Sequence, residues 1–193
     1  MTRRTGTHAA LATMTFVIIC GGAAAQELHA PTGQGRLEVP IPLRVEHNQI
    51  RDELAKARQD GGGVGDAARV LERVWGPHLA QSEASVLPPL GVLRALTRNE
   101  AIPEAAQTIA MSAQLERDLP NLLEEQRLLY GETKRFMDVA TREKKPAYVE
   151  LARRLWMHLQ MEEDVLYPTV LLIGRQLKAR ESTRPKPTTS AHR

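Results

Sequence analysis

A histidine and a glutamate four residues apart, His158 and Glu162, are spaced as metal ligands on a helix often are. Residues four apart lie one helical turn above another, so both side chains would point the same way, about 6 Å apart along the axis. Residues that suit a helix's buried face recur around the pair at three- and four-residue steps. They are Leu151, Leu155, Val165, Leu166, Thr169, Leu172 and Ile173. Because a buried carboxylate is costly unless it is paired or coordinated, the pattern favours a metal site or a hydrogen-bond network.

The same pattern occurs earlier in the chain, which indicates an internal repeat. His78 aligns with His158 at an offset of 80 residues, and His47 aligns with Gln126 at an offset of 79. Each half would be a pair of antiparallel helices with polar residues on its buried stripe. Two such halves predict an all-α, up-down-up-down four-helix bundle with approximate two-fold symmetry. An aromatic content of only 4% also favours helices over strands.

The helices are expected to be separated by proline and glycine. The expected helical ranges are 43–59, 66 to the proline pair at 88–89, 104–140 and 146–178. Pro77 should kink or restart the second helix. The glycine run 61–65 is expected to form a flexible loop. The domain plan is therefore a signal peptide (1–25), an extended leader (26–42), the bundle (43–178) and a disordered basic tail (179–193).

The N-terminus has the layout of a secretory signal. Two arginines precede an apolar stretch, 9–19, and five small residues precede Gln26, so we expect cleavage after Ala25 and a periplasmic or secreted protein. A lipid anchor on Cys20 is less favoured, because Ile19 occupies the position that a lipoprotein signal gives to a small residue. An uncleaved membrane anchor is the other alternative, although the apolar stretch is short for a span.

Cleavage would leave a nearly neutral protein without cysteine. Of 26 basic residues two lie in the signal, so 24 remain against 23 acidic ones, a net charge of +1. This balance gives no indication of a nucleic-acid partner. The single cysteine lies within the signal, so the mature chain would have neither a disulfide nor a thiolate ligand. A metal would have to be bound by nitrogen and oxygen, and no membrane span would remain.

The order of these residues resembles the hemerythrin-like, or HHE cation-binding, proteins. The similarity spans roughly residues 43–176, and its most specific part is the segment H-x-x-x-E-E-x-x-L-x-P, residues 158–168. Proteins of this family are four-helix bundles that hold a non-haem di-iron centre. The resemblance implies four metal ligands in this chain. They are His47, His78, His158 and Glu162.

Two ligand positions depart from the family pattern. Ser82 stands where a glutamate is expected, and Gln126 stands where a histidine is expected. Two divalent ions about 3.5 Å apart repel by on the order of 20 kcal/mol at an effective dielectric near 20, so bridging carboxylates are needed. A neutral hydroxyl cannot supply that charge. We therefore expect one ion rather than two, with the metal-free state as the other possibility.

The family's geometry would bring His47, His78 and Glu162 to that one ion, with positions left open. Two imidazoles and a carboxylate suit iron(II), and also zinc or manganese. His158 would then bind a weak second ion, or hydrogen-bond to Glu162 or Gln126. Glu83 could replace the missing carboxylate only if its helix were rotated by part of a turn.

The resemblance implies binding of dioxygen or nitric oxide, or metal sensing, at a non-haem iron. No nucleophile or general-base pair indicates an enzyme. The competing hypothesis is a metal-free bundle that serves as a structural or interaction module, and haem binding through histidine and methionine ranks last. Trp75, Tyr130 and Tyr167 are expected to pack in the bundle, with Tyr130 the candidate for a hydrogen bond to a ligand. No feature of the sequence identifies a protein partner.

Overall fold

The computed structural model describes residues 37–183, and these are helical apart from short connections, with no strand among them. The all-α prediction is confirmed for this part of the chain. The predicted signal peptide, its cleavage site and Cys20 lie outside the described residues. No helix in the 37–183 range has the length and apolar content to span a membrane.

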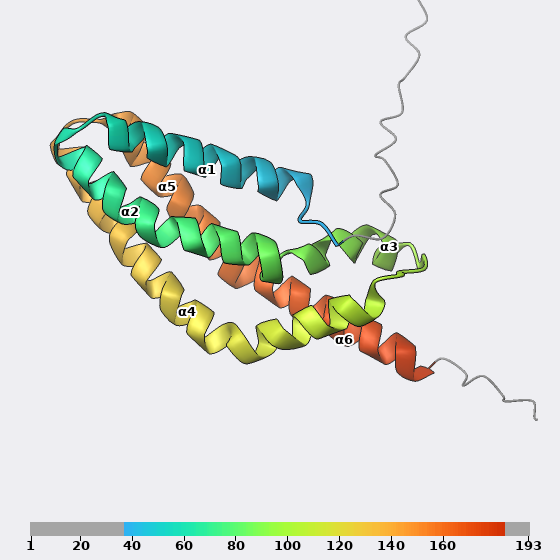
Figure 1. The fold of residues 1–193 in the computed structure, drawn as a ribbon. Coiled ribbons are helices and arrows are strands. Elements are labelled where there is room, and N and C mark those ends of the chain that lie inside the picture. The colour runs from blue at the N-terminus through green and yellow to red at the C-terminus, as the bar shows by residue number, and fades with distance from the viewer. Residues whose placement is uncertain (1–36, 184–193) are drawn as a thin grey trace, which may run out of the picture. The chain divides into compact units, whose positions relative to one another are not determined.

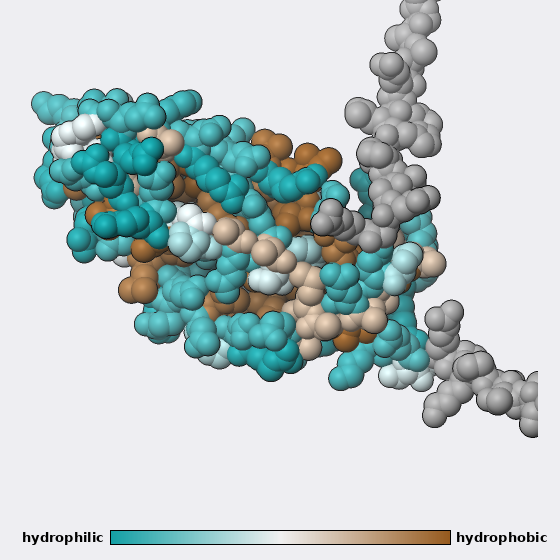
Figure 2. All heavy atoms as spheres, viewed as in Figure 1, coloured by the Kyte–Doolittle hydropathy of each residue, from teal (hydrophilic) through white to brown (hydrophobic). Residues whose placement is uncertain are grey.

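The long helices pack side by side along much of their length (Figure 1). Helix α1 packs along α2, α2 along α4, and α4 along both α5 and α6. Their bounds are α1 Ile41–Gln59, α2 Gly62–Gln81, α4 Ala105–Arg142, α5 Pro146–Met161 and α6 Tyr167–Thr183. The short elements η2 (Pro88–Val92) and α3 (Leu93–Thr97) lie between α2 and α4. Hydrophilic residues cover most of the face in Figure 2, with apolar patches between them.

Helix ends differ from the predicted ranges by a few residues. Helix α1 begins at Ile41 rather than residue 43, with Pro42 in its first turn, where a missing N–H has no cost. Helix α6 continues to Thr183, so the residues after 178 do not leave the helix where the tail was expected to begin.

The prediction of a flexible glycine loop between α1 and α2 is wrong. The chain reverses at Gly61 and Gly62, whose φ angles of 71° and 61° favour glycine, and α2 already begins at Gly62. A Cβ atom on Gly65 would lie 3.1 Å from the carbonyl oxygen of Arg58. Glycine is therefore used here for a tight turn and for a close approach of two helices.

Two π-helical turns interrupt the α-helical geometry at related positions. The first, η1 (Ser82–Val86), follows α2, and the second, η3 (Glu162–Leu166), joins α5 to α6. Their first residues are 80 positions apart, which equals the larger offset of the internal repeat predicted from the sequence. Each π-turn accommodates one extra residue. Helix α2 runs through Pro77 without interruption, so the expected restart at that proline does not occur.

The second π-turn changes which residues are buried after Glu162. Val165 and Leu172, predicted to lie on the buried face, are 53% and 65% exposed. Ile173, also predicted there, is buried, and the other buried residues of α6 are Tyr167, Val170, Gly174 and Leu177. A five-residue turn moves the inward position from 166 to 167, and the following positions shift with it.

A polar layer separates two apolar clusters in the bundle interior. One cluster contains Ile50, Leu79, Leu129 and Leu159, and the other contains Leu43, Val86, Leu122 and Tyr167. In each long helical segment, the residues on one side of a buried polar residue belong to one apolar cluster, and those on the other side belong to the second. These residues are His47, His78, Ser82, Gln126, His158 and Glu162. Four segments of the bundle thus bring polar side chains to the same level.

Candidate metal site

All four predicted ligand residues meet in this polar layer. His47 and Glu162 have no exposed surface, His158 is 1% exposed and His78 is 4% exposed. They come from α1, α2, α5 and the start of η3, so no single helix could assemble the group. Polar side chains this deeply buried need partners, because desolvation is costly.

Three of the four residues form a group that could hold a metal ion. His47, His158 and Glu162 each offer one ligand atom, and these atoms lie within 4.8 Å of one another. Bonds of about 2.1 Å allow two ligand atoms of one ion to be at most about 4.2 Å apart. The side chains would therefore move inward by less than about 1 Å to bind an ion. The donor set, two nitrogens and one oxygen, suits a first-row divalent metal.

Carboxylates contact the outward nitrogens of both imidazoles. His47 Nδ1 lies 2.8 Å from Glu83 Oε1, in hydrogen-bonding geometry. His158 Nδ1 lies 3.2 Å from Glu46 Oε1, which is an ion-pair contact without the direction of a good hydrogen bond. Because the two nitrogens of an imidazole point in different directions, Nε2 of each ring is left for the interior. A carboxylate on Nδ1 is a common support for metal-binding histidine.

The inward nitrogens lack protein partners. Within residues 37–183, no group hydrogen-bonds to His47 Nε2 or to His158 Nε2. The latter lies 3.6 Å from Glu162 Oε1, beyond hydrogen-bonding distance. Leaving a buried polar atom unpaired costs about 1–3 kcal/mol, and native proteins rarely do so. Two such nitrogens beside a buried carboxylate fit a bound cation.

His78 takes a different role from the one expected. Its Nε2 lies 2.7 Å from Glu162 Oε2, and the same oxygen accepts hydrogen bonds of 3.1 Å from Gln126 Nε2 and from the Tyr167 hydroxyl. The expected trio of His47, His78 and Glu162 is thus replaced by one containing His158. The reason is that His78 approaches the carboxylate oxygen that Gln126 and Tyr167 already occupy.

The two substituted positions now serve Glu162. The Ser82 hydroxyl donates to Glu162 Oε1 at 3.1 Å, and the Gln126 amide donates to Oε2. Each supplies a neutral hydrogen-bond donor where the family pattern has a charged or coordinating group. Neither side chain therefore brings a second carboxylate or a further imidazole nitrogen to the group.

Charge pairing strongly perturbs the metal-free group. Burial by itself raises the pKa of the Glu162 carboxyl, but hydrogen bonds and charge from His158 and His78 outweigh it and hold the pKa far below its usual range. Burial by itself lowers the pKa of His158, but the Glu162 and Glu46 carboxylates outweigh it and raise the pKa to about 9. Burial lowers the pKa of His47, with Glu83 opposing.

Two residues of the site were not expected to belong to it. Tyr167 was expected to pack, yet its hydroxyl donates to Glu162. Glu46 precedes His47 in sequence and contacts His158, from another helix. The only sequence signal for the Tyr167 hydrogen bond is its spacing of five residues from Glu162. No simple sequence pattern indicates the contact between Glu46 and His158. Glu83 contacts His47 Nδ1 and so stands behind the imidazole, not among the three converging ligand atoms.

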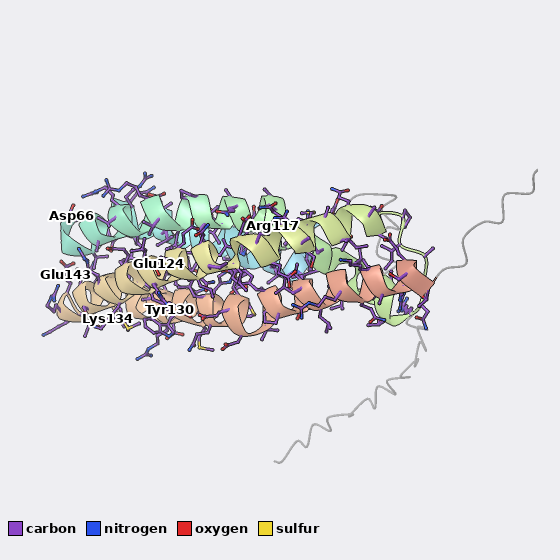
Figure 3. All side chains as sticks on the ribbon, turned by 90° about the horizontal axis from the view of Figure 1, so that it is seen from below. Asp66, Arg117, Glu124, Tyr130, Lys134 and Glu143 are labelled. Carbon is purple, nitrogen blue, oxygen red and sulfur yellow. The ribbon has the colours of Figure 1, made fainter. Side chains whose placement is uncertain are left out.

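The aromatic residues named from the sequence lie around the site. Trp75 is buried, donates to the Thr133 hydroxyl and has its ring 5.7 Å from that of His78. Tyr130, on α4 in Figure 3, packs on Trp156 at 4.6 Å between ring centroids. Burial raises the pKa of Tyr130 to about 12. The part of the chain that the structure describes shows no hydrogen bond from Tyr130 to a candidate ligand.

Comparison of this chain with protein-family models, with curated proteins and with solved structures finds no match.

Proposed function

We propose that the chain is an exported, hemerythrin-like protein, an up-down-up-down four-helix bundle that holds one non-haem metal ion, preferably iron. The ligands in this proposal are His47, His158 and Glu162. The observation that carries it is the pair of buried, unpartnered imidazole nitrogens beside a charged carboxylate. Bound there, an iron(II) with open coordination positions would supply a binding place for dioxygen or nitric oxide.

The surrounding residues would fix this group in place. Glu83 and Glu46 hold the Nδ1 edges of the two imidazoles, so each ring presents Nε2 to the interior. His78, Gln126 and Tyr167 contact one oxygen of Glu162 and restrict the orientation of the carboxylate. The apolar clusters on both sides of the layer exclude bulk water. The ligands would thus be positioned before a metal binds.

Metal analysis after anaerobic iron loading tests the proposal. We expect about one ion per chain in the parent protein and none in the His47→Ala or Glu162→Ala variants, with Glu163→Gln as an exposed neighbouring control. A value near two would contradict the single-ion proposal, and absorbance in the haem Soret region would indicate a different cofactor. Localisation of a tagged full-length chain tests export separately.

A second candidate is a metal-free bundle that serves as a structural or interaction module. The observation that favours it is the network on Glu162, in which Oε2 already accepts from three groups. A protonated His158 between Glu162 and Glu46 would then balance the buried charge. Absence of metal from the loaded parent protein would establish this candidate over the first.

A further inference from the structure

A pocket of about 260 Å³ lies between α2 and α4 and reaches His78. Four of its lining residues are apolar and the other four are polar, and the polar ones include one positive and one negative side chain. The apolar residues are Val74, Pro77, Leu128 and Leu129, and the polar ones are Arg73, His78, Gln81 and Glu125. One positive and one negative side chain give the lining no net charge. The volume admits a molecule of a few heavy atoms and is at the lower edge of the range for larger ligands.

His78 separates this pocket from the buried carboxylate. Its side chain keeps 3% of its surface exposed, whereas the side chains of Glu162 and His158 keep none. His78 lines the pocket, and its Nε2 lies 2.7 Å from Glu162 Oε2. One imidazole ring therefore stands between the pocket and the candidate ligand group.

Of the groups that hydrogen-bond to Glu162, His78 is the one that lines the pocket, and the carboxylate keeps other donors without it. If the ring turned away, Oε2 would still accept from Gln126 and Tyr167, and Oε1 would still accept from Ser82. The carboxylate would thus stay satisfied while a path from the pocket opened. His47 and His158, by contrast, are held from behind by carboxylates.

We propose that the pocket between α2 and α4 holds a small neutral molecule, such as dioxygen or nitric oxide, and that rotation of His78 admits it to the metal site. This inference rests on the proposed function. The lining carries one positive and one negative side chain, which favours an uncharged ligand over an anion. Because only one imidazole ring stands between the pocket and the site, a ligand of two or three heavy atoms is favoured over a larger one.

Quenching of Trp75 fluorescence by dioxygen tests the pocket in metal-free protein. The chain has two tryptophans, so a Trp156→Phe background leaves only Trp75, which is buried beside His78. We expect a severalfold lower quenching constant after Leu128→Phe combined with Val74→Phe, and a higher constant after His78→Ala. The matched control is Leu172→Phe, because Leu172 is 65% exposed against 63% for Leu128 and does not line the pocket.

Stopped-flow mixing of nitric oxide with iron-loaded protein tests the path to the site. The pocket-filling double variant should bind nitric oxide severalfold more slowly, with unchanged iron content, and the Leu172→Phe control should match the parent. Equal rates in all three proteins, or quenching that does not respond to pocket filling, would overturn the inference. If the parent binds no iron, the proposed function fails, and the quenching result still decides the pocket's role.

Discussion

Replacing Glu162 by glutamine should destabilise the metal-free protein far more than the same change one residue later. The carboxylate pairs with His78 and lies near His158, and it accepts from Ser82, Gln126 and Tyr167. Glutamine keeps the volume, so no cavity forms. However, the glutamine amide NH2 would face groups that are themselves hydrogen-bond donors. The substitution also removes the negative charge beside the imidazoles of His78 and His158.

Breaking a buried ion pair by removing one partner costs about 3–5 kcal/mol, a large part of a total stability of about 5–15 kcal/mol. At roughly 2–4 °C per kcal/mol for a protein of this size, Glu162→Gln should lower Tm by roughly 6–20 °C. Glu163→Gln is the control, because Glu163 is exposed and such surface changes alter stability by about 0.5 kcal/mol or less.

Thermal unfolding followed by circular dichroism, with EDTA present, measures this difference. Anaerobic iron(II) should then raise Tm of the parent and of Glu163→Gln, because a ligand that binds only the folded state stabilises it. It should leave Glu162→Gln unchanged. Equal Tm values for the two glutamine variants would refute the view that the buried charge organises this layer.

Three further outcomes are expected. Glu46→Gln should weaken metal affinity by about 10–100-fold without changing stoichiometry, as measured by competition with a chelating dye. Tyr167→Phe should cost about 0.5–1.5 kcal/mol in chemical denaturation, whereas Tyr130→Phe should be neutral, since only the first hydroxyl bonds within the site. In EDTA, the raised pKa of His158 gives stability that is full below pH 6.5 and lost as pH rises through about 9. The lowered pKa of Glu162 gives stability that is present above pH 4.5 and lost on acidification. The lowered pKa of His47 costs stability as the pH falls below 6.5, so the denaturation midpoint should be highest near pH 6.5 and fall on both sides.

The sequence was sufficient to predict the helices and the burial of their polar residues. His47, Ile50 and Leu54 form the expected inward face of α1, and Gln126 lies on the inward face of α4. These predictions succeed because apolar residues at helical spacing lie on one face of a helix, and that face is the one buried in the core. The burial of His78, His158 and Glu162 follows from the same rule. Whether they bind a metal remains a prediction.

The parts that could not be predicted depend on departures from α-helical geometry and on contacts between helices. A π-turn moves the buried position from residue 166 to Tyr167, and no residue type announces such a turn. The contact of Glu46 with His158 joins α1 to α5, so it depends on how the two helices are rotated. The choice of His158 over His78 for the candidate trio also depends on angles that spacing alone does not give.

The surplus residue in η3 has a practical consequence for protein engineering. Val165 is largely solvent-facing, and deleting it would convert the wide turn into an ordinary α-turn. The side chains from Tyr167 onward would keep their inward direction, and the helix would shorten by about 1.5 Å. The apolar side chains of α6 would therefore still face the interior, while the hydroxyl of Tyr167 lost its alignment with Glu162. A one-residue deletion would thus test whether the helical fold depends on the hydrogen bond between Tyr167 and Glu162.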